Sequence, residues 1–123
     1  MKYLGVDFGL KRIGLARSEG TIASPWKVIE GSSFYNLLQQ LQKEASLFDK
    51  IVVGLPEGKM AKLVKRLVKL LRASGFEVAE ADETLSSQIA VSQMVKLNVP
   101  RKKRLVNDAY SAAIILQDYL DTK

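Results

Sequence analysis

The chain has 123 residues, a length usual for one domain, and its hydrophobic fraction of 47% provides material for a core. It has no cysteine and no histidine, which excludes disulfides, thiolate metal sites and a histidine general base. The net charge of +6 fits either a polyanionic partner or a solubilising surface. No membrane span or signal peptide is recognisable, so we expect one cytoplasmic domain over residues 1–123, with no membrane partner.

The first predicted strand carries an acid in its interior. Period-two alternation puts Asp7 on the same face as Gly5, whose missing side chain leaves open space there. A carboxylate inside a strand is costly to desolvate, so we expect a metal ion, a cation or a hydrogen-bond cluster to meet it. After Asp7, Gly9 fits a tight turn that needs a positive φ.

Two more strands, over residues 12–17 and 21–28, complete an antiparallel meander. Pro25 interrupts the third strand and marks it as an edge strand or a bulge. A helix follows, with apolar residues at helical spacing and Ser32 or Ser33 as its cap.

The second half alternates strands and helices. We expect a buried strand over 51–53, a helix over 59–74 that stops at Gly75, a strand over 76–81 and a helix that runs to about 97. A basic loop and a last helix over about 106–120 complete the chain. This order predicts an α/β fold: a mixed five-stranded sheet, with a three-strand antiparallel meander plus two parallel strands, flanked by helices.

Three acids occupy unusual places, namely Asp7, Glu83 and Asp108. Glu83 closes the last strand, at the sheet edge where ligands gather, and Asp108 lies in the first turn of the last helix. Each has a structural explanation: turn hydrogen bonds for Asp7, a helix cap for Glu83, and the helix dipole for Asp108. Together, in a chain without histidine, they favour an oxygen-ligand site for Mg²⁺ or Mn²⁺, ions that serve phosphoryl chemistry.

Two basic clusters adjoin these acids. Lys11 and Arg12 directly follow the strand of Asp7, and the predicted loop before Asp108 consists of Arg101, Lys102, Lys103 and Arg104. We interpret both clusters as contacts to the phosphates of a nucleic acid. The basic side of the helix over 59–74, in contrast, is interpreted as a solvated helix face.

The motifs of the chain resemble those of the YqgF/RuvX family, in the family's order and over nearly the whole chain. They are Val6-Asp7-Phe8-Gly9 with Lys11-Arg12-Ile13-Gly14-Leu15-Ala16, Ile22-Ala23-Ser24-Pro25, Val52-Val53-Gly54-Leu55-Pro56, Asp82-Glu83 with Leu85-Ser86-Ser87, and Asn107-Asp108-Ala109 with Ala112-Ala113-Ile114-Ile115-Leu116-Gln117. The resemblance implies a ribonuclease-H-like fold and metal-dependent phosphodiester hydrolysis. It maps the family's three acids onto Asp7, Glu83 and Asp108, as catalytic residues and metal ligands.

The family is associated with trimming the 5′ end of precursor 16S rRNA, and has also been called a Holliday junction resolvase by analogy of fold. We therefore expect a metal-dependent endonuclease that holds two Mg²⁺ or Mn²⁺ ions. Its partner would be structured RNA, above all precursor rRNA, or branched DNA. The protein would act as a monomer or a weak homodimer.

Two departures from the family pattern support other hypotheses. Thr84 stands where the family usually has an arginine, and the loop after Pro56 is shorter than usual. One alternative is therefore a nucleic-acid-binding module with impaired catalysis. A third hypothesis is an ATPase of the actin/hexokinase type, although those enzymes resemble two copies of such a core and this chain has room for one.

Overall fold

A computed structural model of the chain describes residues 1–56, 58–82 and 101–122, with the backbone alone described for 101–107. In chain order the described elements are β1 (Tyr3–Phe8), β2 (Arg12–Ser18), β3 (Ser24–Glu30), α1 (Phe34–Ala45), β4 (Lys50–Leu55), α2 (Met60–Ala73), β5 (Val78–Asp82) and α4 (Arg101–Asp121). The helix predicted to end near residue 97 lies outside the described residues, as do Glu83 and Thr84.

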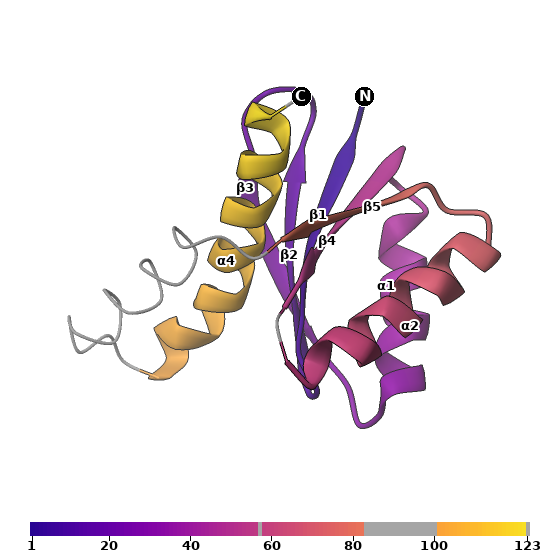
Figure 1. Cartoon of the computed structure of the whole chain (residues 1–123). Coiled ribbons are helices and arrows are strands. Elements are labelled where there is room, and N and C mark those ends of the chain that lie inside the picture. The colour runs from indigo at the N-terminus through magenta and orange to yellow at the C-terminus, as the bar shows by residue number, and fades with distance from the viewer. Residues whose placement is uncertain (57, 83–100, 123) are drawn as a thin grey trace.

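The described strands form one five-stranded sheet in the order β3-β2-β1-β4-β5. The β1–β2 and β2–β3 pairs are antiparallel, while β1–β4 and β4–β5 are parallel. Helices α1 and α2 cover one face of the sheet and α4 covers the other (Figure 1). The predicted α/β fold, with a meander joined by two parallel strands, is thereby confirmed.

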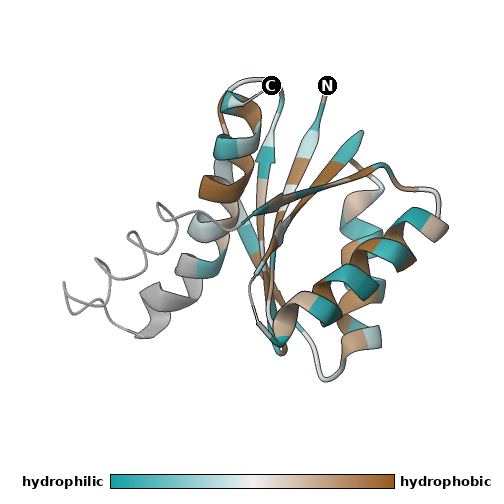
Figure 2. Ribbon diagram, viewed as in Figure 1, coloured by the Kyte–Doolittle hydropathy of each residue, from teal (hydrophilic) through white to brown (hydrophobic). Residues whose placement is uncertain are grey.

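Alternation along β1 divides the core between the two faces. Leu4, Val6 and Phe8 point into the cluster beneath α1 and α2, whereas Tyr3 packs into the cluster beneath α4. Buried residues of α1 and α2 belong to the cluster on one face of the sheet, and buried residues of α4 belong to the cluster on the other. Hydrophobic residues, coloured brown, alternate with hydrophilic ones along these helices (Figure 2). The alternation along β1 places the side chain of Asp7 on the α4 side.

Two predicted helix boundaries are confirmed by their hydrogen bonds. The Ser33 hydroxyl accepts from the backbone N–H of Asn36 at 3.1 Å and caps α1. Gly75 follows α2 with φ of 96°. The N–H of Phe76 donates to the carbonyl of Leu71 at 3.1 Å, which closes the helix end with the geometry that a left-handed glycine permits.

Other expectations about glycine were wrong. Among the described residues, the glycines with positive φ are Gly58 and Gly75, so Gly9 turns the chain without that conformation. Its N–H donates to the carbonyl of Arg12 at 2.8 Å and closes the β1–β2 hairpin. The space beside Gly5 is also not open, because a Cβ added there would lie 2.8 Å from the Cβ of Leu116 in α4.

The start of the last helix corrects a further prediction. The stretch Arg101-Lys102-Lys103-Arg104 is not a loop, because α4 begins at Arg101 and these residues form its first turn. Asp108 is therefore the eighth residue of α4 and lies well beyond the first turn, so the helix-dipole explanation for this acid no longer applies.

The third strand behaves as predicted: β3 is an edge strand, and its register with β2 shifts beside Pro25. None of the helices in the described ranges combines the length and the apolar character that crossing a membrane requires.

Candidate active site

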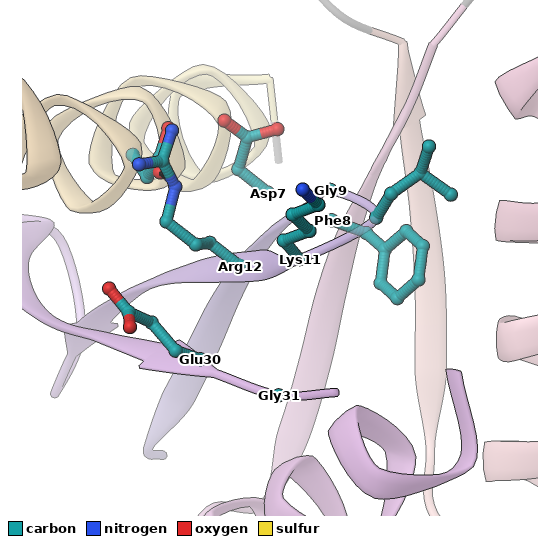
Figure 3. A pocket seen from close by; sticks show the side chains of 9 residues that line it. Asp7, Phe8, Gly9, Lys11, Arg12, Glu30 and Gly31 are labelled. Carbon is teal, nitrogen blue, oxygen red and sulfur yellow. Dashed lines mark ion pairs between the residues drawn. The ribbon is translucent and has the colours of Figure 1, made fainter. Parts of the chain in front are cut away.

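A pocket of about 730 Å³ opens at the end of the sheet where β1 turns into β2. It is lined by Asp7, Phe8, Gly9, Leu10, Lys11, Arg12, Glu30, Gly31 and Asp108 (Figure 3). Three carboxylates and two cations thus surround one hollow. They come from the β1–β2 hairpin, from the end of β3 and from α4.

Asp7 reaches this pocket through the alternation of β1. The side chain of Phe8 packs against Phe34 of α1, so its neighbour Asp7 must point to the opposite side of the sheet (Figure 3). Asp7 is half-buried, and its antiparallel partner on β2 is Gly14. The carboxylate therefore lies beside a strand position that has no side chain.

Asp108 reaches the same pocket because α4 lies directly on Gly14. A Cβ at Gly14 would overlap the backbone carbonyl of Asp108 and would lie 2.8 Å from the backbone nitrogen of Ala109. The helix can therefore approach β2 at this point more closely than any other residue would allow. As a result, Asp108 comes to the strand position next to Asp7.

Arg12 forms an ion pair with Asp108, with Nε 3.1 Å from Oδ2. Burial raises the pKa of Asp108 above its ordinary value, while the nearby Arg12 guanidinium lowers it by a smaller amount. The carboxylate is thus partly desolvated, and the charge of Arg12 offsets only part of the cost of burying it. Such a group attracts a cation.

Glu30 is a pocket residue that the sequence interpretation missed. The third strand was expected to end at residue 28, but β3 continues to Glu30, which is the cross-strand partner of Arg12. Gly31 follows, and its N–H donates to the carbonyl of Lys11 at 3.1 Å. The opposite charges of residues 12 and 30 were the available signal, since cross-strand pairs of opposite charge are favourable.

The structure therefore brings together four of the predicted site residues, namely Asp7, Lys11, Arg12 and Asp108. Glu83 lies outside the described residues, and the side chains of 101–104 are not described, so their placement stays a prediction. Within residues 1–56, 58–82 and 108–122, no three acidic side chains form a group able to hold a metal ion.

Comparison with known proteins gives a match over nearly the whole chain. The family model described as "RuvX: Holliday junction resolvase" matches residues 1–122. A protein of Tropheryma whipplei named "Putative pre-16S rRNA nuclease" is 34% identical over 126 residues, covering 97% of this chain and 86% of that protein. A protein of the same name from Bacillus cytotoxicus is 36% identical over 138 residues, covering 100% of both.

Two solved structures share the fold. The fowlpox virus resolvase, in complex with Holliday junction DNA, has a TM-score of 0.61 at 13% identity, covering 99% of this chain and 98% of that chain. Thermus thermophilus RuvC, in complex with a Holliday junction substrate, has a TM-score of 0.60 at 14% identity, covering 99% and 96%. These likenesses concern the fold alone, which is the ribonuclease-H-like architecture expected from the motifs. Since the family model spans residues 1–122 and relatives exceed 30% identity over the full chain, this protein belongs to the RuvX family.

Proposed function

We propose that this protein is a metal-dependent nuclease that hydrolyses phosphodiester bonds of structured nucleic acid at the pocket of Asp7 and Asp108. One observation carries the proposal: carboxylates from β1 and from α4 line the same pocket as Lys11 and Arg12. Carboxylates are the available ligands for a hard cation in a chain that lacks histidine and cysteine. The two basic side chains supply positive charge for a phosphate backbone.

The residues present fit Mg²⁺ or Mn²⁺. Both ions prefer carboxylate oxygens, and the partly desolvated Asp108 already attracts a cation, the guanidinium of Arg12. Asp7 and Asp108 would hold the metal together with Glu83, the third acid predicted from the sequence. When bound, two such ions lower the pKa of water and neutralise charge on the phosphate.

The chain's own side chains would then orient the substrate. Lys11 and Arg12 follow the hairpin turn and face the pocket that Asp7 and Asp108 line, so they can bind the phosphates that flank the scissile bond. In the present structure Arg12 neutralises Asp108 instead. A metal ion bound at the carboxylates would release this guanidinium, which could then bind the phosphate backbone of the nucleic acid.

The substrate that we propose first is precursor 16S rRNA, processed at its 5′ end during ribosome biogenesis in the cytoplasm. The names of the curated relatives support this choice. Resolution of a Holliday junction is the alternative, supported by the description of the family model and by the titles of the structural neighbours. Junction resolution needs two symmetric cuts, so it requires a dimer on the DNA.

One side-by-side cleavage assay tests these proposals. Precursor 16S rRNA and a four-way DNA junction are incubated with Mn²⁺, with Mg²⁺ or with EDTA, using wild type and Asp7→Asn. We expect metal-dependent cleavage of the rRNA precursor by wild type and none by the variant. Equal residual activity in both proteins would contradict the assignment of the site, and cleavage of the junction alone would favour the resolvase.

A binding module with impaired catalysis is the second candidate, since Thr84 replaces the usual arginine of the family motif. It predicts salt-dependent affinity for the same RNA without cleavage under any metal condition. The assay above separates the two candidates when a binding measurement is made on the same samples.

A further inference from the structure

One segment of the chain is strongly basic and contains no acid. Six of the 19 cations lie within residues 59–72, where the sequence has no acid. The other 13 cations are equal in number to the chain's 13 acids. The segment, which spans Lys59 and all of α2 except Ala73, thus carries a charge equal to the net charge of the whole chain, +6.

Five of these cations are exposed along one side of α2. Apart from Ala73, the exposed side chains of the helix are Lys62, Lys65, Arg66, Lys69 and Arg72. Hydrophilic residues recur along the helix, while its apolar side packs on the sheet (Figure 2). Lys62, Lys65 and Lys69 make no ion pair with any residue that the structure describes, unlike Lys27 with Glu44.

This arrangement weakens the helix that carries it. Like charges three or four positions apart, such as Lys65 and Lys69, repel each other by about 0.2 to 0.5 kcal/mol per pair. Lys59 precedes α2 without a side-chain cap and places positive charge at the positive end of the helix dipole. The charge is thus not a means of stabilising α2, and an anionic partner gives it a role.

An exposed aromatic side chain lies beside these cations. Tyr35, in the first turn of α1, is 58% exposed. Arg66 Nη2 donates to the Tyr35 hydroxyl at 2.7 Å, and the guanidinium carbon lies 5.8 Å from the ring centroid. A ring held in place by a cation, with much of its surface in solvent, is suited to stack on an unpaired base.

This surface starts at the same end of the sheet as the pocket. The strands β1 and β4 are parallel, so α2 begins near the end of β1 that carries Asp7. On the α1 side, Phe8 of the pocket packs edge-to-face on Phe34 at 5.8 Å, and Phe34 in turn packs on Tyr35 at 5.5 Å. The pocket and the start of α2 thus lie toward the same end of the sheet, and a nucleic-acid strand that contacts both would pass around this end from the α4 face to the α2 face.

We propose that the exposed side of α2, namely Lys62, Lys65, Arg66 and Lys69, forms with Tyr35 a second nucleic-acid contact surface, here called the basic α2 face. The lysines bind the phosphate backbone of structured RNA outside the cleavage site, and Tyr35 stacks on an unpaired base. This replaces the earlier interpretation of the segment as a solvated helix face. The inference rests on the proposed nuclease for the choice of partner, but its test does not depend on cleavage.

The first experiment measures binding without catalysis. A fluorescent RNA hairpin with a single-stranded 5′ extension is titrated in EDTA at several salt concentrations, with wild type, Lys65→Gln/Lys69→Gln and the control Lys2→Gln/Lys43→Gln. All four lysines are exposed, and glutamine is a good helix former. We expect weaker binding by the α2 variant, with a salt slope smaller by roughly 1.5, because each lost phosphate contact removes about 0.7 to 0.9.

The control double variant should bind as wild type does. Equal loss in both double variants would indicate a general effect of net charge, and no loss in either would indicate a solvated surface. Both outcomes overturn the proposal. Circular dichroism of each variant establishes that α2 remains folded.

Tyr35 gives a second, charge-independent measurement. Tyr35→Ala should weaken binding of the hairpin at least about fivefold, whereas Tyr35→Phe, which keeps the ring, should retain most of the affinity. The effect should disappear on a fully paired duplex, which offers no base to stack. Equal loss for Ala and Phe on both RNAs would contradict the stacking role.

Hydrolysis of a small diester distinguishes this surface from the pocket. Bis(4-nitrophenyl) phosphate is too small to reach α2, so the Lys65/Lys69 variant should hydrolyse it with Mn²⁺ as wild type does, while its KM for RNA rises. A loss on both substrates would mean that the variant disturbs the pocket, against the proposal. A wild type that hydrolyses neither substrate contradicts the nuclease, and the titration of the fluorescent hairpin in EDTA alone then decides on the basic α2 face. Binding to phosphatidylserine vesicles is measured on the same proteins. If the Lys65/Lys69 variant binds the vesicles less well than wild type but binds RNA equally well, the basic α2 face belongs to a membrane contact instead.

Discussion

Asp108 rests with its backbone directly on Gly14, with no room between them for a methyl group. Gly14 is also the antiparallel partner of Asp7. The missing side chain at this position of β2 therefore lets α4 lie close to the strand beside Asp7 and brings the carboxylates of two remote segments to one pocket. The glycine of the Lys11-Arg12-Ile13-Gly14 motif thus has a packing role that is specific to the proposed site.

Gly14→Ala is expected to destabilise the protein by about 2 to 3 kcal/mol or more, because the obstacle is helix backbone and cannot turn aside like a flexible side chain. The substitution should also reduce nuclease activity, since α4 and Asp108 must move away from Asp7. Urea unfolding followed by circular dichroism measures the stability.

The matched control is Gly20→Ala, at a position where a Cβ would meet nothing within 4 Å. This variant should be as stable as wild type or slightly more stable, because alanine restricts the unfolded chain. If the two alanine variants unfold at the same urea concentration, the close contact between Gly14 and α4 is not what positions the helix.

Asp108 should make the free energy of unfolding depend on pH in the direction opposite to that caused by an acid whose pKa is lowered by a salt bridge. Burial raises its pKa in the folded state, so the folded protein binds the proton more tightly than the unfolded chain. The free energy of unfolding should therefore fall as the pH rises from about 4, the unfolded value, through the raised folded value. Asp108→Asn has no carboxyl group that titrates at this position, so its free energy of unfolding does not fall for this reason. Its stability relative to wild type should therefore increase over that pH range.

Urea unfolding of wild type and Asp108→Asn between about pH 4 and 7, without divalent cations, measures this difference. The half-exposed ion pair with Arg12 is lost in the variant, but such pairs contribute little. Glu19→Gln, an exposed carboxylate in a turn, serves as the control and should show no comparable trend. If the stability of Asp108→Asn instead falls relative to wild type as the pH rises, the expected sign is contradicted.

The elements governed by short-range rules were predictable from the sequence. Period-two alternation placed Asp7 opposite Phe8, the hydroxyl of Ser33 marked the start of α1, and Gly75 marked the end of α2. Each rests on backbone geometry that a few neighbouring residues determine. The order of strands and helices then restricted the sheet to a mixed topology.

The features that depend on tertiary packing were not predictable. The missing side chain of Gly5 predicts open space beside β1, because nothing in the neighbouring sequence indicates that α4 fills it. The position of Arg101 directly after Pro100 predicts a loop, although lysine and arginine are good helix formers and proline is compatible with the start of a helix. Glu30 was missed because the boundary of β3 was placed two residues too early.

Arg12→Gln is expected to raise the pKa of Asp108 further, since it removes the charge that partly offsets burial. Arg12→Lys keeps a positive charge and should shift the pKa less. The pKa can be followed through the carbon-13 shift of the Asp108 carboxyl in an NMR titration. Arg17→Gln removes an exposed cation near the other end of the same strand and should leave the titration unchanged. An unchanged pKa in Arg12→Gln would mean that the ion pair is absent in solution.

Mn²⁺ should stabilise the wild-type protein, because a ligand that binds the folded state adds about 2.7 kcal/mol at a hundredfold excess over its Kd. Asp7→Asn and Glu83→Gln should each reduce the rise in melting temperature with Mn²⁺, if carboxylates from β1 and from the segment after β5 share the ion. Glu77→Gln, an exposed carboxylate before β5, is the control and should respond to Mn²⁺ as wild type does. Differential scanning fluorimetry over a Mn²⁺ series, with EDTA as the reference, provides the measurement. A full response in Glu83→Gln together with a lost response in Asp7→Asn would keep the metal at the pocket but remove Glu83 from its ligands.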